Sequence, residues 1–195
     1  IDKDVACCDY TVGYDTAMKT IMDMVDRIRD TTESHDRCSV VEVMGRRAGY
    51  LALNAGIAVG ATSILIPEVP YDFERDVIER MRRTQKTGKK HFIIIVAEGI
   101  GGVEEMAKRI EEATGVESRA SVLGHVQRGG SPTGRDRVVA SPMGNYFVRL
   151  LGKGIGNRVV AMQKEEVMDF DIYEALNMKK SIDLNLYRIA HEISI

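Results

Sequence analysis

The residues best suited to chemistry are concentrated between Arg119 and Arg137. This run of nineteen residues holds four arginines, one histidine and a Gly-Gly pair. A guanidinium group presents a planar set of donors that matches phosphate oxygens, and glycine lets a ligand approach the backbone closely. The run therefore indicates an anion-binding loop, although its composition alone fits a basic surface loop equally well.

The segments on either side of this loop predict how it is held. An apolar run at 120–123 predicts the end of a strand, Gly130-Ser131-Pro132 predicts a turn, and the residues from Arg135 onward predict a helix. The cationic groups would then lie at the carboxyl end of a strand. Open α/β sheets bind their ligands at such ends.

The rest of the chain alternates between two kinds of segment. Apolar and β-branched runs predict strands at 38–43, 63–66, 91–97, 117–123 and 158–162. Amphipathic or Ala- and Leu-rich segments predict helices at about 15–31, 49–59, 72–87, 103–114 and 135–151. Asp15 and Asp72 are placed to cap two of them. This alternation predicts an α/β fold on a parallel sheet, in which 91–97, the most apolar run, is a central strand.

Polar motifs follow four of these predicted strands. They are Met44-Gly45-Arg46, Pro67-Glu68, Glu98-Gly99 and Gly124-His125. Because the carboxyl ends of parallel strands share one edge of a sheet, we expect a ligand site there. The tail after residue 166 is expected to be partly helical and contains no motif that we can interpret.

Composition excludes several classes of protein. The 195 residues are 44% hydrophobic and 29% charged with a net charge of −2, which is typical of a soluble globular protein and gives no reason to expect nucleic acid as a partner. The three cysteines have neither disulfide-framework nor zinc-site spacing, which favours a reducing cytoplasm. The sequence shows no membrane-spanning run. Since it begins at Ile1 without a methionine, we expect a piece of a longer protein.

The spacing within the cationic loop resembles the signature of the phosphofructokinase family. Arg119 is followed after four residues by Gly124-His125, then by Gln127 to Gly130, and then by Asp136-Arg137. Further segments resemble bacterial-type 6-phosphofructokinases: 1–4, 9–13, 26–31 and 40–46. The resemblance covers nearly the whole chain and weakens after about residue 162.

This resemblance implies a fold and a division into domains. The fold would be a three-layer, parallel-sheet, phosphofructokinase-like α/β fold, and the chain would be the carboxyl-side portion of the enzyme, after its glycine-rich nucleotide loops. Residues 1–13 would end the nucleotide domain, 14–126 would form the sugar-phosphate domain, and 127–195 would return to the nucleotide domain.

The resemblance also implies a reaction, the transfer of a phosphoryl group from ATP, with Mg²⁺, to the 1-hydroxyl of fructose 6-phosphate. Asp2 would take the proton from that hydroxyl, Asp4 would lie near the magnesium and the phosphate, and Arg46 would stabilise charge in the transition state. Without the resemblance, Asp2 and Asp4 read as a solvated acidic turn. Lys3 replaces the asparagine of the family, and its ammonium would lower the basicity of both carboxylates.

By the same resemblance, a larger set of residues would contact the substrate: Ile1, Asp2, Arg37, Met44, Gly45, Arg46, Glu98, Arg119, His125 and Arg128. Glu98 would contact a sugar hydroxyl, because a carboxylate would repel the phosphate. His125 and Arg128 would bind the 6-phosphate together with Arg37 and Arg119, which would reach in from a neighbouring subunit. The enzyme would therefore be an oligomer, and we expect a homotetramer.

Arg29, Gly60, Lys89 and His91 match the allosteric effector site of the family. Their types also fit a solvated helix end and a basic turn. Thr62 stands where the family has a carboxylate that helps to hold the effector's magnesium, so allosteric control is in question here.

Two alternative functions remain open at this stage. One is a pyrophosphate-dependent enzyme of the same family, although Gly124 to Arg128 favours ATP. The other is a non-catalytic regulatory half that binds a sugar phosphate. Asp2 and Asp4 argue against this second alternative, and Lys3 argues for it.

Overall fold

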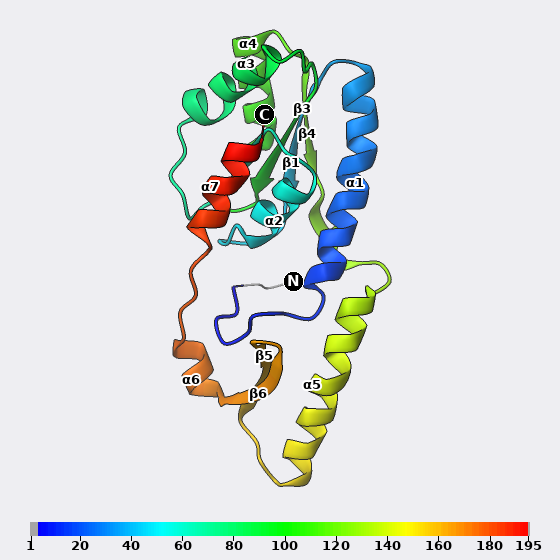
Figure 1. The fold of residues 1–195 in the computed structure, drawn as a ribbon, viewed down its shortest axis with the longest axis vertical. Coiled ribbons are helices and arrows are strands. Elements are labelled where there is room, and N and C mark those ends of the chain that lie inside the picture. Colours follow the sequence, from blue (N-terminus) through cyan, green and yellow to red (C-terminus); the bar gives the residue numbers. More distant parts are fainter. Residues whose placement is uncertain (1–3, 195) are drawn as a thin grey trace. The chain divides into compact units, whose positions relative to one another are not determined.

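The computed structural model describes residues 4–194, which divide into two compact units (Figure 1). Unit 1 combines residues 4–19 with Arg128–Ser181, and unit 2 combines Thr20–Gln127 with residues 182–194. Helix α1 (Tyr14–Ser34) begins in unit 1 and ends in unit 2. The roles predicted for Ile1, Asp2 and Lys3 fall outside the described residues.

Unit 2 is built on a four-stranded parallel sheet. Its strands are β1 (Cys38–Val43), β2 (Ser63–Leu65), β3 (Phe92–Ala97) and β4 (Ser118–Val122), in the order β2-β3-β1-β4. All six residues of β3 are buried, and this strand pairs with β1 on one side and β2 on the other. The prediction of a central parallel strand at 91–97 is confirmed.

Helices pack against both faces of this sheet (Figure 1). On one face, α4 (Val103–Thr114) and the helix formed by η1 (Glu74–Ile78) and α3 (Glu79–Gln85) bury apolar side chains against Val40, Ile94 and their neighbours of the same parity. On the other face, the Thr32 hydroxyl of α1 lies 2.6 Å from the Ser39 hydroxyl. Helix α2 (Tyr50–Ala58) lies on Ile64 so closely that a Cβ at Gly56 would be 2.4 Å from the Ile64 side chain. These layers give the expected three-layer α/β arrangement.

The two predicted helix caps have different outcomes. Asp72 accepts the backbone N–H of Arg75 at 2.8 Å, so its predicted role at the start of the η1–α3 helix is confirmed. Helix α1 already begins at Tyr14, which places Asp15 inside its first turn rather than at the cap. The acceptor at this end of α1 is Asp136, a residue 120 positions away in the sequence.

Unit 1 corrects one expectation about the sheet. The predicted strand at 158–162 is β5 (Arg158–Gln163), but it does not extend the parallel sheet. It pairs antiparallel with β6 (Glu166–Asp171) in a separate hairpin. The two-residue turn, Lys164-Glu165, has φ angles of 50° and 66°. Such a turn is usually signalled by Asn-Gly, and neither of those residues is present, which explains why the hairpin was not predicted.

Three further helices complete the fold. Helices α5 (Gly134–Gly152) and α6 (Ile172–Asn177) belong to unit 1, whose core includes the buried Cys7, Cys8 and Ala161. Helix α7 (Leu184–Ile193) belongs to unit 2, where the Tyr187 hydroxyl donates to the Ile64 carbonyl at 3.3 Å. Among the helices described, none has the length and apolar character needed to cross a membrane.

The buried carboxylate of Asp136 holds unit 1 together. Only 2% of this residue is exposed. Its Oδ1 accepts hydrogen bonds from the Tyr10 hydroxyl at 2.6 Å and the Gly13 N–H at 2.8 Å, and its Oδ2 accepts from the N–H and the hydroxyl of Thr16. Burial raises the pKa of Asp136, but these hydrogen bonds outweigh burial and hold the pKa below its usual value.

We predict that Asp136→Asn destabilises the protein by about 2–4 kcal/mol, because an amide cannot accept from all four donors and its NH₂ group would face some of them. Chemical denaturation near pH 7 measures this change. The folded pKa lies below the unfolded value, so the stabilisation is present above about pH 4 and is lost as the pH falls through the folded pKa.

The matched control is Asp15→Asn, at the same end of α1. It removes a charge near the helix start and should cost only about 0.5 kcal/mol. If the two variants lost equal stability, or if Asp136→Asn kept the acid sensitivity of the wild type, Asp136 would not have this structural role.

Candidate active site

The loop that follows β1 is held by side chains from two other segments of unit 2. The Glu98 Oε1 atom accepts the backbone N–H groups of Gly45, at 3.2 Å, and Arg46. One residue earlier, the N–H of the buried Met44 donates to the Gln127 Oε1 atom at 3.0 Å. Three successive N–H groups beyond the sheet therefore have acceptors, and the predicted motifs after β1 and β3 lie in contact.

Glycine is required where these loops meet. Gly45 has a φ of +153°, and a Cβ there would lie 2.2 Å from the Ala48 carbonyl oxygen. A Cβ on Gly99 would lie 2.5 Å from the Arg46 carbonyl oxygen. Arg46 itself has a φ of +52° and an exposed side chain. The backbone at Gly45 and Arg46 is thus held in a shape that few other residues adopt, with the guanidinium free to reach solvent or a ligand.

Gln127 joins the third predicted motif to the same place. Its side chain is 1% exposed, and its Nε2 donates to the Gly124 carbonyl at 2.9 Å while its Oε1 accepts from Met44. This contact holds the short 3₁₀ turn η2 (Gly124–Arg128), on which His125 is exposed. Our sequence reasoning gave Gln127 no role of its own. The signal for this role is a buried amide whose oxygen and nitrogen are both hydrogen-bonded. Only the fold reveals such an arrangement.

A second cationic cluster lies where β1 and β4 begin. The Arg37 Nε is 2.8 Å from Glu117 Oε2, and the Arg119 Nη2 is 2.7 Å from Glu117 Oε1. The two guanidinium groups, that of Arg37 first, lower the pKa of Glu117. Arg37 and Arg119 line one pocket of about 330 Å³, together with Arg27. Our sequence reasoning also missed Glu117, whose carboxylate holds the two arginines side by side.

The two clusters lie at opposite ends of the same strands. Arg37 precedes the six residues of β1, and Met44 follows them. At about 3.3 Å per residue, β1 separates the two ends by roughly 20 Å. Within one copy of unit 2, Arg37 and His125 therefore cannot contact the same phosphate group.

Two further predicted site residues are described in unit 1. Asp4, predicted to lie near the magnesium and the phosphate, and Arg128, predicted to bind the 6-phosphate, are both exposed. Within residues 4–194, no three acidic, histidine or cysteine side chains are grouped so that they could hold a metal ion.

Three of the four predicted effector residues lie close together in unit 2: Arg29, Gly60 and Lys89. The Arg29 guanidinium donates to the Val59 carbonyl, immediately before the exposed Gly60. Burial, and then the nearby charge of Arg29, lower the pKa of Lys89. His91 is half-buried just before β3. The arrangement is a small cationic surface, and the buried Thr62 supplies no charge to it.

The chain is similar to the proteins of one known family. The family model described as Phosphofructokinase matches residues 1–151. The chain is 54% identical to the ATP-dependent 6-phosphofructokinase of Bacillus pumilus and 53% identical to that of Bacillus subtilis, over 195 residues in each case. Each alignment covers all of this chain but only 61% of the relative.

Solved structures share the fold. The phosphofructokinase of Saccharomyces cerevisiae superposes with a TM-score of 0.86 at 28% identity, over 99% of this chain and 27% of that one. A pyrophosphate-dependent phosphofructokinase from Marinobacter aquaeolei superposes with a TM-score of 0.72 at 22% identity, over 90% of this chain and 49% of that one. Because the family model matches residues 1–151, well over half of its length, this chain belongs to the phosphofructokinase family.

Proposed function

We propose that this chain provides the sugar-phosphate site of an ATP-dependent 6-phosphofructokinase. The enzyme would transfer a phosphoryl group from ATP to the 1-hydroxyl of D-fructose 6-phosphate, giving fructose 1,6-bisphosphate, as a glycolytic enzyme of the cytoplasm. The main support is the hydrogen-bonded contact of three strand-end motifs, which brings Arg46, Glu98 and the turn that bears His125 together in unit 2. The names of relatives at 53–54% identity favour ATP as the donor. The pyrophosphate-dependent neighbour, at 22% identity, supports the fold alone.

In this proposal, each polar group has one task. Asp2 accepts the proton of the attacking hydroxyl, Arg46 stabilises the charge that develops on the transferred phosphoryl group, and Glu98 contacts a sugar hydroxyl. Glu98 Oε1 already accepts two backbone N–H groups, which leaves Oε2 for the sugar. Because a guanidinium is planar and permanently charged, Arg46 and Arg128 suit phosphate contacts.

Mg²⁺ fits the acidic residue that this segment provides. Mg²⁺ in kinases is typically bound by one or two carboxylates together with the phosphates of the substrate, so a three-acid cage is not required. Asp4 offers one exposed carboxylate and would hold the ion. When bound, the ion would neutralise charge on the phosphates.

We also propose that the active site is shared between subunits of a homotetramer. Arg37 and Arg119 are held at the end of the sheet opposite His125, roughly 20 Å away along β1. Four cationic groups can surround one 6-phosphate only if two of them come from another copy of the chain. The pocket beside Arg37 and Arg119, with the bridging Glu117, supports this division of the site.

We assign unit 1 to the nucleotide domain of the enzyme. Helix α5 exposes apolar side chains at Val138, Phe147, Val148 and Leu151. An exposed apolar face of this kind usually contacts another segment. The chain spans 61% of the length of its curated relatives, and we propose that the remaining portion of such a protein covers this face.

We also propose that an anionic effector binds in unit 2, at Arg29, Gly60, Lys89 and His91.

The test of this function uses the complete protein that contains this chain. A coupled assay should detect fructose 1,6-bisphosphate formed from fructose 6-phosphate and ATP, and little from pyrophosphate. Asp2→Asn should lower kcat by roughly 10²–10⁴-fold, the usual contribution of a positioned general base. The KM for fructose 6-phosphate should change little, because a base acts mainly as the proton moves.

Asp4→Asn is the matched comparison, two residues away with the same loss of charge. It should raise the magnesium concentration needed for half-maximal rate. If the assay gives no product from either donor while fructose 6-phosphate still binds, the chain belongs to a regulatory half. If Asp2→Asn keeps more than about a tenth of the wild-type kcat, Asp2 is not the base.

Shared sites predict complementation between inactive subunits. Arg119→Ala should raise the KM for fructose 6-phosphate far more than the KM for ATP, and Asp2→Asn should abolish most turnover. Mixed tetramers of the two variants should recover activity, since some sites then combine an intact Asp2 with a neighbour's intact Arg119. Activity is measured after confirming subunit mixing by native mass spectrometry. Mixed tetramers that stay inactive would place both residues in the site of one subunit.

A further inference from the structure

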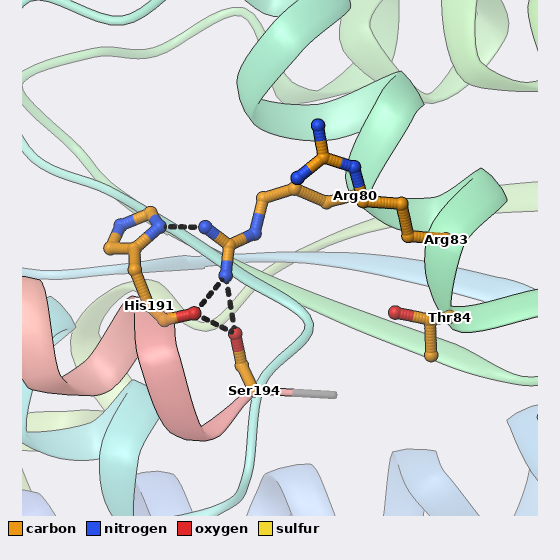
Figure 2. Close-up of a pocket in the computed structure, with 5 residues that line it drawn as sticks. All are labelled: Arg80, Arg83, Thr84, His191 and Ser194. Carbon is orange, nitrogen blue, oxygen red and sulfur yellow. Dashed lines mark hydrogen bonds between the residues drawn. The ribbon is translucent and has the colours of Figure 1, made fainter. Parts of the chain in front are cut away.

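A separate pocket of about 230 Å³ lies between α3 and α7 in unit 2 (Figure 2). It is lined by Arg80, Arg83, Thr84, His191 and Ser194. None of these residues belongs to the sites described above. The described lining residues carry two guanidinium groups, an imidazole and two hydroxyls, and none of them is acidic.

Arg80 joins the two helices through neutral partners. Figure 2 shows its guanidinium directed at α7, where it contacts His191 Nδ1, the His191 carbonyl at 2.5 Å and the Ser194 hydroxyl at 2.7 Å. Its Nε donates to the Thr62 carbonyl at 3.3 Å. All four acceptors are uncharged. His191 adds no positive charge at neutral pH, because burial, followed by the charge of Arg80, lowers its pKa to about 4.

Two carboxylates of the η1–α3 helix interact with these arginines: Asp76 with the charge of Arg80, and Glu79 with Arg83. Asp76 receives two hydrogen bonds at 2.7 Å from the Arg75 guanidinium. Glu79 lies 3.5 Å from Arg83, but in an exposed pair one turn away on the same helix. Within the described part of the chain, no acid is within ion-pairing distance of Arg80. A half-buried guanidinium normally has an anionic partner, because removing a cation from water costs free energy that neutral acceptors only partly restore.

We infer that this pocket binds a small phosphate-like oxyanion. The anion would contact the Arg80 and Arg83 guanidiniums, whose charges affect each other, and would accept from the Thr84 hydroxyl. The Ser194 hydroxyl already donates to the Thr62 carbonyl at 3.3 Å. A free phosphate or a small phosphate ester has the size and charge for such a pocket, which is smaller than the sites of most drug-sized ligands. By neutralising Arg80, the anion would tighten the contact of α7 with α3 and with the Thr62 carbonyl beside β2.

The inference predicts a change in phosphate affinity that depends on Arg83. In the complete protein, inorganic phosphate is titrated by calorimetry at constant ionic strength, with chloride as the balancing salt. Arg83→Gln removes a cation whose ion pair with Glu79, at 3.5 Å, is exposed, and it should weaken phosphate binding at this site about tenfold or more. The control is Arg82→Gln, on the same helix but outside the pocket, which should change the affinity less than about twofold.

A second variant and a location experiment keep the test decisive. Thr84→Val is nearly isosteric and should also weaken phosphate binding. It takes the place of Arg83→Gln in the test if that variant fails to fold. Crystals soaked in selenate should show anomalous density between Arg80 and Arg83. Titration with glycerol 3-phosphate distinguishes an ester from the free ion, because an ester that binds more tightly identifies the pocket as a phosphate-ester site.

Phosphate can also bind the proposed substrate site, so Arg119→Ala is titrated in parallel. Phosphate binding lost in Arg119→Ala but kept in Arg83→Gln would overturn the pocket inference and leave the proposed function intact. An effect that chloride reproduces, or equal affinities in Arg83→Gln and Arg82→Gln, would also overturn it.

Discussion

The candidate site depends on how the backbone is satisfied where β1 leaves the sheet. Beyond Val43, the N–H groups of Met44, Gly45 and Arg46 have no strand to pair with. Two side chains accept these hydrogen bonds instead: Glu98, immediately after β3, and Gln127 of η2. Because an unsatisfied buried N–H costs about 1–3 kcal/mol, these two acceptors stabilise a loop shape that would otherwise be unfavourable. The same contacts bring three separate segments of the chain to one edge of the sheet.

A parallel sheet has two ends, and this chain places cationic groups at both. The carboxyl end carries Arg46 and the turn with His125. The amino end carries Arg37 and Arg119, each of which pairs with Glu117, at 2.8 and 2.7 Å. A carboxylate between two guanidiniums limits their mutual repulsion and keeps both forks oriented before a ligand arrives, which lowers the cost of binding. The rigidity of the buried strands keeps these two groups apart, and this separation is why we propose that a second copy of the chain completes the site.

Local sequence patterns were sufficient to predict the strands of the parallel sheet and the helices between them, but not helix α7 or the turn η2, and they did not predict which side chains meet. The segment 38–43 could be identified because a run of apolar and β-branched residues has few stable alternatives to a buried strand. The partners of Asp136, Gln127 and Glu117 could not be identified, because a carboxylate or amide in a sequence does not show which distant donor it meets. The hairpin at Lys164 and Glu165 was missed because its φ angles are positive at residues that rarely adopt them.

The domain assignment of the candidate site stays a prediction, as do the roles of Asp2 and Asp4. What the structure adds is a contrast between two charged groups. Asp136 is surrounded by four hydrogen-bond donors from its own unit, so its charge is fully used inside the fold. Within residues 4–194, the hydrogen-bond acceptors of Arg80 are all neutral, and Arg80 lines a pocket. A charge that the fold itself satisfies needs no ligand, whereas one left with neutral partners beside an open space favours an ion of opposite sign.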